Sequence, residues 1–195
     1  MPDAGPDYLP DLLRRLQILQ GDGSAVMQSL EQAALEHPGD ARVFLLLGAE
    51  RMHGKDVDGA EAAYIAALQL APTFHIARFQ LGLLQLTSGR PAAALSTWTP
   101  LDQLDDKDPL RLFKTGLEFL AQDRFEEARR WLMQGIAQNQ SNPPLNRDMQ
   151  MVLDRIAHLG AAAGPVEQGD GMPDPEATPR ESADHFLVSA YRKVH

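Results

Sequence analysis

The sequence predicts an all-α protein, a short right-handed α-solenoid made of repeated helical hairpins. Three observations lead to this prediction. Val and Ile, which favour strands, are sparse, apolar residues recur at helical spacing, and the chain is similar to itself at a period of 34 residues. We therefore expect a stack of helix-turn-helix units, each of which buries apolar surface against its neighbours.

The period is carried by residues of fixed size at fixed positions. A glycine, an alanine and a bulky residue each recur 34 residues apart, at Gly48, Gly82 and Gly116, at Ala60, Ala94 and Ala128, and at Tyr64, Trp98 and Leu132. Small residues allow the two helices of a hairpin to approach closely. The bulky residue is expected to fill the gap to the next unit, and a proline such as Pro72 to stop the second helix.

This pattern resembles the tetratricopeptide repeat family over residues 7–142. The first unit is degenerate, because it has Arg14 where the glycine is expected. The expected organisation runs from a leader (1–6) through a repeat array (7–160) and a flexible linker (161–177) to an amphipathic C-terminal helix (178–195). Within the array we expect the degenerate repeat at 7–40, repeats at 41–74, 75–108 and 109–142, and a capping helix at 143–160.

The third unit departs from the family pattern at two positions. Arg78 replaces the usual large apolar residue early in its first helix. Pro100 follows Trp98 inside the second helix, where it removes a backbone hydrogen bond and is expected to kink or end the helix. We expect an irregular connection from there to the fourth unit.

The resemblance also implies a binding face. In this family the first helix of each unit lines a concave groove, and any single position there can equally be interhelix core. The matching positions here are Arg42, Leu45, Ala49, Met52, His53, Ile76, Phe79, Gln80, Leu83, Leu86, Leu110, Phe113, Lys114 and Leu117. As a set they are mostly apolar, which suits an amphipathic helix or an extended apolar peptide.

The last eighteen residues, "TPRESADHFLVSAYRKVH", predict a helix with one apolar face. Thr178, Pro179 and Glu181 supply an N-cap, a first-turn proline and a capping-box acid. The apolar face consists of Phe186, Leu187, Ala190, Tyr191 and Val194. This segment could dock in the protein's own groove, dock in that of a second copy to give a homodimer by tail exchange, bind another protein, or pack as additional core.

Several functional classes are disfavoured by composition and spacing. The chain has no cysteine, and its six histidines show no metal-ligand or catalytic spacing, so we expect no metal, no cofactor and no enzyme activity. A net charge of −9 argues against nucleic acid or an anionic membrane as partner. No signal peptide and no spanning segment are recognised, which predicts a cytoplasmic protein.

The sequence therefore predicts a non-enzymatic adaptor or assembly factor. Its concave groove would hold an apolar or amphipathic segment of another protein, and its own C-terminal helix could mask that groove. The alternative is a cytoplasmic chaperone for a hydrophobic client of a bacterial secretion system, which rests on a likeness of size and all-helical repeats. The partner's identity is not encoded in any motif that we recognise.

Overall fold

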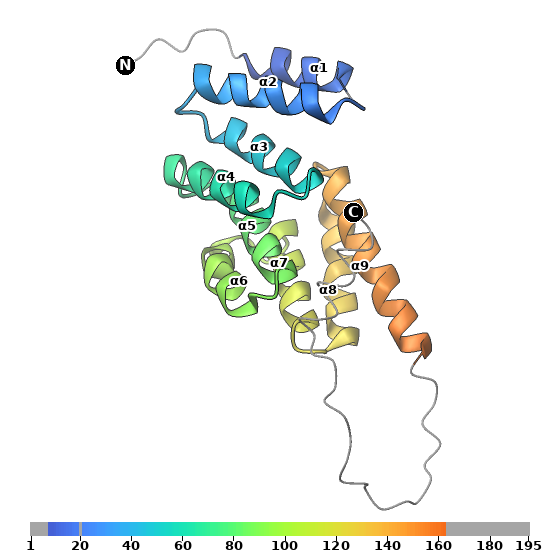
Figure 1. Ribbon diagram of the computed structural model, residues 1–195. Helices are drawn as coiled ribbons and strands as arrows, with labels where there is room; N and C mark the ends of the chain where they lie inside the picture. The colour runs from blue at the N-terminus through green and yellow to red at the C-terminus, as the bar shows by residue number, and fades with distance from the viewer. Residues whose placement is uncertain (1–7, 20, 163–195) are drawn as a thin grey trace, which may run out of the picture. The chain divides into compact units, whose positions relative to one another are not determined.

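The computed structural model describes residues 8–19 and 21–162 (Figure 1). The expected leader and the predicted C-terminal helix lie outside this part of the chain, as does nearly all of the expected linker. Every regular element in the described residues is a helix, which confirms the predicted all-α class.

Nine α-helices and one 3₁₀-helix are seen in the described residues. They are α1 (Leu9–Ile18), α2 (Gly23–Glu36), α3 (Ala41–His53), α4 (Val57–Leu70), α5 (His75–Thr87), α6 (Pro91–Trp98), η1 (Thr99–Gln103), α7 (Pro109–Leu120), α8 (Phe125–Gln138) and α9 (Pro143–Ala162). The chain divides within α5 into two compact units, Met1–Leu81 and Gly82–His195. Each unit is described by itself below.

Local sequence explains where several helices begin. Aspartates at the N-cap positions of α2, α3, α4 and α7 accept a hydrogen bond from a backbone N–H of the first turn; these are Asp22, Asp40, Asp56 and Asp108. Each carboxylate satisfies a donor that the helix leaves open and sits at the positive end of the helix dipole. Proline occupies the first turn of α6 and α7, where its missing N–H costs no helical hydrogen bond.

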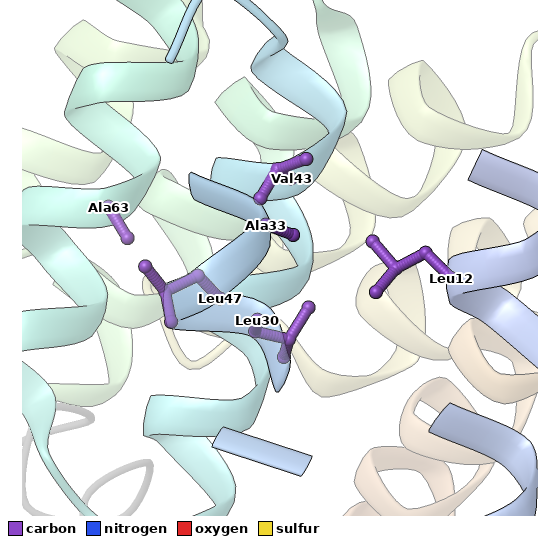
Figure 2. Close-up of a cluster of buried hydrophobic side chains, with 6 residues drawn as sticks. All are labelled: Leu12, Leu30, Ala33, Val43, Leu47 and Ala63. Carbon is purple, nitrogen blue, oxygen red and sulfur yellow. The ribbon is translucent and has the colours of Figure 1, made fainter. Parts of the chain in front are cut away.

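The first unit has two apolar clusters. The larger is formed by α1, α2, α3 and α4, and Figure 2 shows its buried members: Leu12, Leu30, Ala33, Val43, Leu47 and Ala63. The smaller is built from three buried alanines, Ala41, Ala67 and Ala77, surrounded by partly buried side chains that include Phe44 and Phe74. Helices α3 and α4 each contribute residues to both clusters and so connect them.

The recurring glycines close the hairpins. A Cβ atom placed on Gly48 would lie 2.5 Å from the ring of Tyr64, and one on Gly116 would lie 2.8 Å from Leu132. In the same way Gly82 faces the indole of Trp98. The bulky residue thus packs against the glycine of its own hairpin, whereas the sequence interpretation assigned it to the gap before the next unit. The aromatic ring fits there because the first helix offers no side chain at that position.

The first hairpin lacks this closure. Arg14 replaces the glycine, and it is exposed. Only Leu12 of α1 is buried, while Leu13 remains 45% exposed and Ile18 77% exposed. Helix α1 therefore rests on α2 and α3 through a narrow contact.

The two departures from the family pattern in the third repeat (75–108) affect the local structure. Helix α6 ends at Trp98, and the chain continues as η1, which contains Pro100. This confirms that the proline ends the helix. Arg78, on α5, turns back to donate from Nη2 to the carbonyl oxygen of Pro72 at 2.7 Å, so it secures the preceding loop in place of an apolar contact.

We predict that Gly48→Ala lowers the free energy of unfolding by about 1–3 kcal/mol, because a Cβ there overlaps a buried ring that has no room to move. Chemical denaturation followed by circular dichroism measures this. Gly39→Ala is the matched control, since a Cβ at Gly39 meets nothing within 4 Å. Equal effects of the two substitutions would contradict the close-packing explanation.

Candidate functional site

One face of α3 carries an uninterrupted strip of predicted groove residues. Leu45, Ala49 and Met52 follow each other at helical spacing and are all partly exposed, and Arg42 and His53 extend the strip at its two ends. The strip is apolar along its middle and ends in a basic or titratable side chain. We call Arg42, Leu45, Ala49, Met52 and His53 the α3 strip.

Helix α5 adds two further groove residues in the same unit. Ile76 and Gln80 are partly exposed, whereas Phe79 is completely buried. A shallow depression lies at the Arg42 end of the α3 strip and is lined by Ala41, Arg42, Ala71, Thr73 and Phe74. Its walls are apolar except for Arg42 and Thr73, so it could accept one apolar side chain of a ligand.

The position of Arg42 is fixed by Asp40. Its Nε lies 3.0 Å from Oδ1 of Asp40, and its Nη2 lies 2.6 Å from Oδ2. The Tyr8 hydroxyl donates to the same carboxylate at 3.0 Å. These hydrogen bonds, that of Arg42 foremost, lower the pKa of Asp40 to about 2. Asp40 was not among the predicted site residues, although its N-cap position could have indicated it.

The second unit places the predicted groove residues differently. Leu83 and Leu110 are partly exposed, but Leu86, Phe113, Lys114 and Leu117 are buried. Phe113 lies against Gly135 of α8, so it closes the α7–α8 hairpin from the opposite side. Side chains inside the unit cannot contact a ligand without rearrangement. We therefore leave these four, and Phe79, out of the proposed binding surface.

The buried Lys114 is paired with two carboxylates, of which Asp102 is exposed and Glu118 partly exposed. Its Nζ lies 2.5 Å from Asp102 Oδ1 of η1 and 3.0 Å from Glu118 Oε1 of α7. Burial lowers the pKa of Lys114, but the two carboxylates outweigh it and the pKa is raised. Burial raises the pKa of Glu118, and the nearby charge of Asp102 adds to this effect, although the contact with Lys114 acts in the opposite direction. The network fastens η1 to α7 and explains how a lysine at a predicted groove position can be buried.

Neither a metal site nor a membrane-spanning helix is found among the residues that the structure describes. No group of three or more His, Asp or Glu residues is arranged there to hold a metal ion. None of the helices within that range is long and apolar enough to cross a membrane.

The predicted tail residues, Phe186, Leu187, Ala190, Tyr191 and Val194, fall beyond Ala162 and so outside the described part of the chain. Their docking site therefore stays a prediction. Of the groove residues, the α3 strip and Ile76 and Gln80 all belong to the first unit.

The described residues define a tetratricopeptide-like helical repeat fold. Two solved structures are similar. "MamA 41-end from Desulfovibrio magneticus RS-1" has a TM-score of 0.55 and 13% identity, over 97% of this chain and 93% of that chain. "MamA RS-1 ArsTM double mutant" has a TM-score of 0.55 and 14% identity, over 97% of both chains. At such identity the likeness shows the fold alone.

No protein-family model matches the sequence, and no curated protein matches it either. The binding surface therefore has to be argued from the residues of this chain.

We predict that Lys114→Ala lowers the free energy of unfolding by about 2 kcal/mol, because it removes charge-assisted hydrogen bonds and leaves Glu118 partly buried without its cation. Lys107→Ala is the control, since Lys107 is exposed and its recorded hydrogen bond comes from the backbone N–H. Urea titration of both variants at neutral pH measures the difference. An equal, small effect of both would show that the network adds nothing to stability.

Asp40 predicts an acid dependence of stability. Its folded pKa lies below the unfolded value of 3.8, so its contribution is present above pH 4 and is lost as the pH falls through about 2. The contribution is roughly 2 kcal/mol from the size of that shift. Between pH 5 and pH 2 the free energy of unfolding should therefore fall more steeply with decreasing pH for the native protein than for Asp40→Asn. Denaturation curves recorded at several pH values measure this. Parallel profiles would contradict the assignment.

Proposed function

We propose that this protein is a non-enzymatic adaptor whose α3 strip, with Ile76 and Gln80 of α5, binds an amphipathic helix of another protein. The observation that carries the proposal is the partly exposed apolar run of Leu45, Ala49 and Met52 on one face of a single helix. An amphipathic helix would match that run with its own apolar residues at three- and four-residue spacing.

Rigidity of the surrounding unit supports this proposal. Helix α3 lies between two apolar clusters, so its partly exposed face is held in place from both sides. A surface that is already ordered loses little conformational freedom when a ligand binds. The depression beside Arg42 adds a place where one anchoring side chain could be buried.

The chemistry of the strip favours apolar over charge-led recognition. Arg42 is already engaged by Asp40, so its charge is largely balanced within the protein. His53 lies 3.6 Å from Glu50 at the other end of the strip. The middle of the strip carries no charge, so affinity would come from the burial of apolar area.

We also propose that the C-terminal segment 178–195 limits access of partners by occupying a surface of its own chain. Its apolar face, predicted from the sequence, would behave as a tethered ligand at high effective concentration. A tethered ligand blocks weak partners and yields to strong ones.

We predict that Met52→Asp weakens binding of a model amphipathic helix at least about tenfold, because it places a charge in the apolar contact. The probe is a fluorescein-labelled synthetic 18-residue helix with leucines on one face and Lys and Glu on the other. Fluorescence anisotropy with the full-length protein gives the Kd, and a scrambled peptide of the same composition reports non-specific binding.

Ile65→Asp is the matched control for this test. Ile65 is a large apolar residue of the same unit, is 40% exposed and lies on α4, outside the strip. Equal loss of affinity in both variants, or equal binding of the helical and scrambled peptides, would contradict the proposed binding face.

A further inference from the structure

Helix α1 packs on an apolar surface of α2 and α3 to which it contributes a single buried residue. This surface, which we call the α1 seat, is formed by Leu30 and Ala33 of α2 and Val43, Leu46 and Leu47 of α3. Leu12 is the one buried residue of α1, and Figure 2 shows its side chain reaching from α1 toward those of α2 and α3. Arg14 stands where the other hairpins have a glycine, so this helix lacks the close approach that Gly48, Gly82 and Gly116 allow.

Four side chains of the stretch 8–16 make the contact with the seat. Tyr8, Leu9 and Leu16 are partly buried against the cluster, and Leu12 is buried in it. The Tyr8 ring also stacks on His37, with ring centroids 3.3 Å apart, and its hydroxyl donates to Asp40. The seat thus selects an aromatic residue followed by apolar residues one, four and eight positions later.

The outward positions of the same stretch are polar or exposed. Pro10, Asp11, Arg14 and Arg15 are all exposed, and the two arginines stand beside each other just before Leu16. The complete pattern of 8–16, "YLPDLLRRL", therefore contains both the contact residues and a basic pair on the side that faces solvent.

The C-terminal segment repeats this pattern. Residues 186–194 read "FLVSAYRKV", with the aromatic residue, the leucine and the two later apolar residues at the same four positions. Phe186, Leu187, Ala190 and Val194 correspond to Tyr8, Leu9, Leu12 and Leu16, and the basic pair Arg192 and Lys193 corresponds to Arg14 and Arg15. Helical order of this kind in both segments would present the same face to the seat.

We propose that residues 186–194 are a second occupant of the α1 seat of the same chain, and take it when α1 leaves. This inference rests on the proposal above that the C-terminal segment docks on its own chain, and it names a docking surface separate from the α3 strip. Docking of the tail would keep the apolar surface of α2 and α3 covered whenever α1 is displaced.

The contacts indicate which of the two segments binds the seat more tightly. Phe186 lacks the hydroxyl with which Tyr8 binds the ionised Asp40, and Ala190 is smaller than Leu12, which is 95% buried in this seat. Contact for contact the tail is the weaker ligand. This ranking agrees with the observed occupancy of the seat by α1 and makes the tail a substitute rather than the resident helix.

The chain itself tethers the proposed ligand to α9. Residues 163–185 separate α9 from the proposed ligand. A random coil of 23 residues has a typical end-to-end distance of roughly 26 Å, and a fully extended chain of that length spans roughly 75 Å. Tethering raises the local concentration of the segment to the millimolar range, which favours the seat of the same chain over that of another copy.

The test gives the tail the residues that α1 has at two of its contact positions; we call this variant the upgraded tail. Because the chain has no cysteine, Gln28→Cys on the exposed side of α2 and Ser189→Cys, which corresponds to the exposed Asp11, give a unique pair of spin-label sites in the full-length protein. We expect a broad distance distribution in this background. Adding Phe186→Tyr with Ala190→Leu should raise the docked fraction about tenfold and produce a narrow distribution below roughly 30 Å, the scale of two or three packed helices.

Matched controls separate docking from a general effect of the substitutions. Leu187→Asp in the upgraded tail should restore the broad distribution, whereas Val188→Asp, at the position of exposed Pro10, should leave it narrow. A reciprocal variant, Tyr8→Phe with Leu12→Ala, weakens α1 and should also shift the native tail toward the seat. Thermal unfolding confirms that each variant remains folded.

Three results would overturn the proposal. The first is a broad distribution in both the upgraded and the reciprocal variants. The second is an equal effect of Leu187→Asp and Val188→Asp. The third is a narrow distribution that disappears on dilution with unlabelled protein, which would assign the docking to a second copy of the chain.

Discussion

The close approach of two helices at a glycine is the contact on which the rest of this structure depends. In three successive hairpins the first helix offers a backbone without a side chain, and Tyr64, Trp98 or Leu132 fills the space. Each of these bulky residues is essentially buried. Because the pair fixes the rotation of both helices, it also determines which residues of the first helix remain available to solvent. The α3 strip is a consequence of the contact between Gly48 and Tyr64.

The places where this contact fails or is interrupted are equally informative. Arg14 removes it from the first hairpin, and Leu12 is the one buried residue of α1. Pro100 shortens α6, and the chain compensates with η1, whose Asp102 binds Lys114. A change at a single repeat position thus alters the local structure of that hairpin. In both cases polar side chains replace part of the lost packing.

Charged groups in this protein mainly hold elements together. Asp40 joins Tyr8 of the first helix to Arg42 of α3, and Lys114 joins η1 to α7. Such bonds are effective because they are partly removed from water, where a charge without a partner is costly. They leave the exposed middle of the α3 strip uncharged, which is the property that the proposed recognition of an amphipathic helix requires.

The sequence alone determined the all-α class, the 34-residue period and the end of α6 at a proline, because these follow from local propensity and from spacing along one chain. It also predicted Leu45, Ala49 and Met52 at helical spacing, and all three lie on α3 and are partly exposed. It could not distinguish them from Phe79, Phe113 or Leu117, which share the same apolar character but are buried. It also did not reveal Asp102 as the partner of Lys114. Only the tertiary structure decided these points, because exposure depends on which neighbouring element covers a helix face, and periodicity within that helix carries no information about its neighbours.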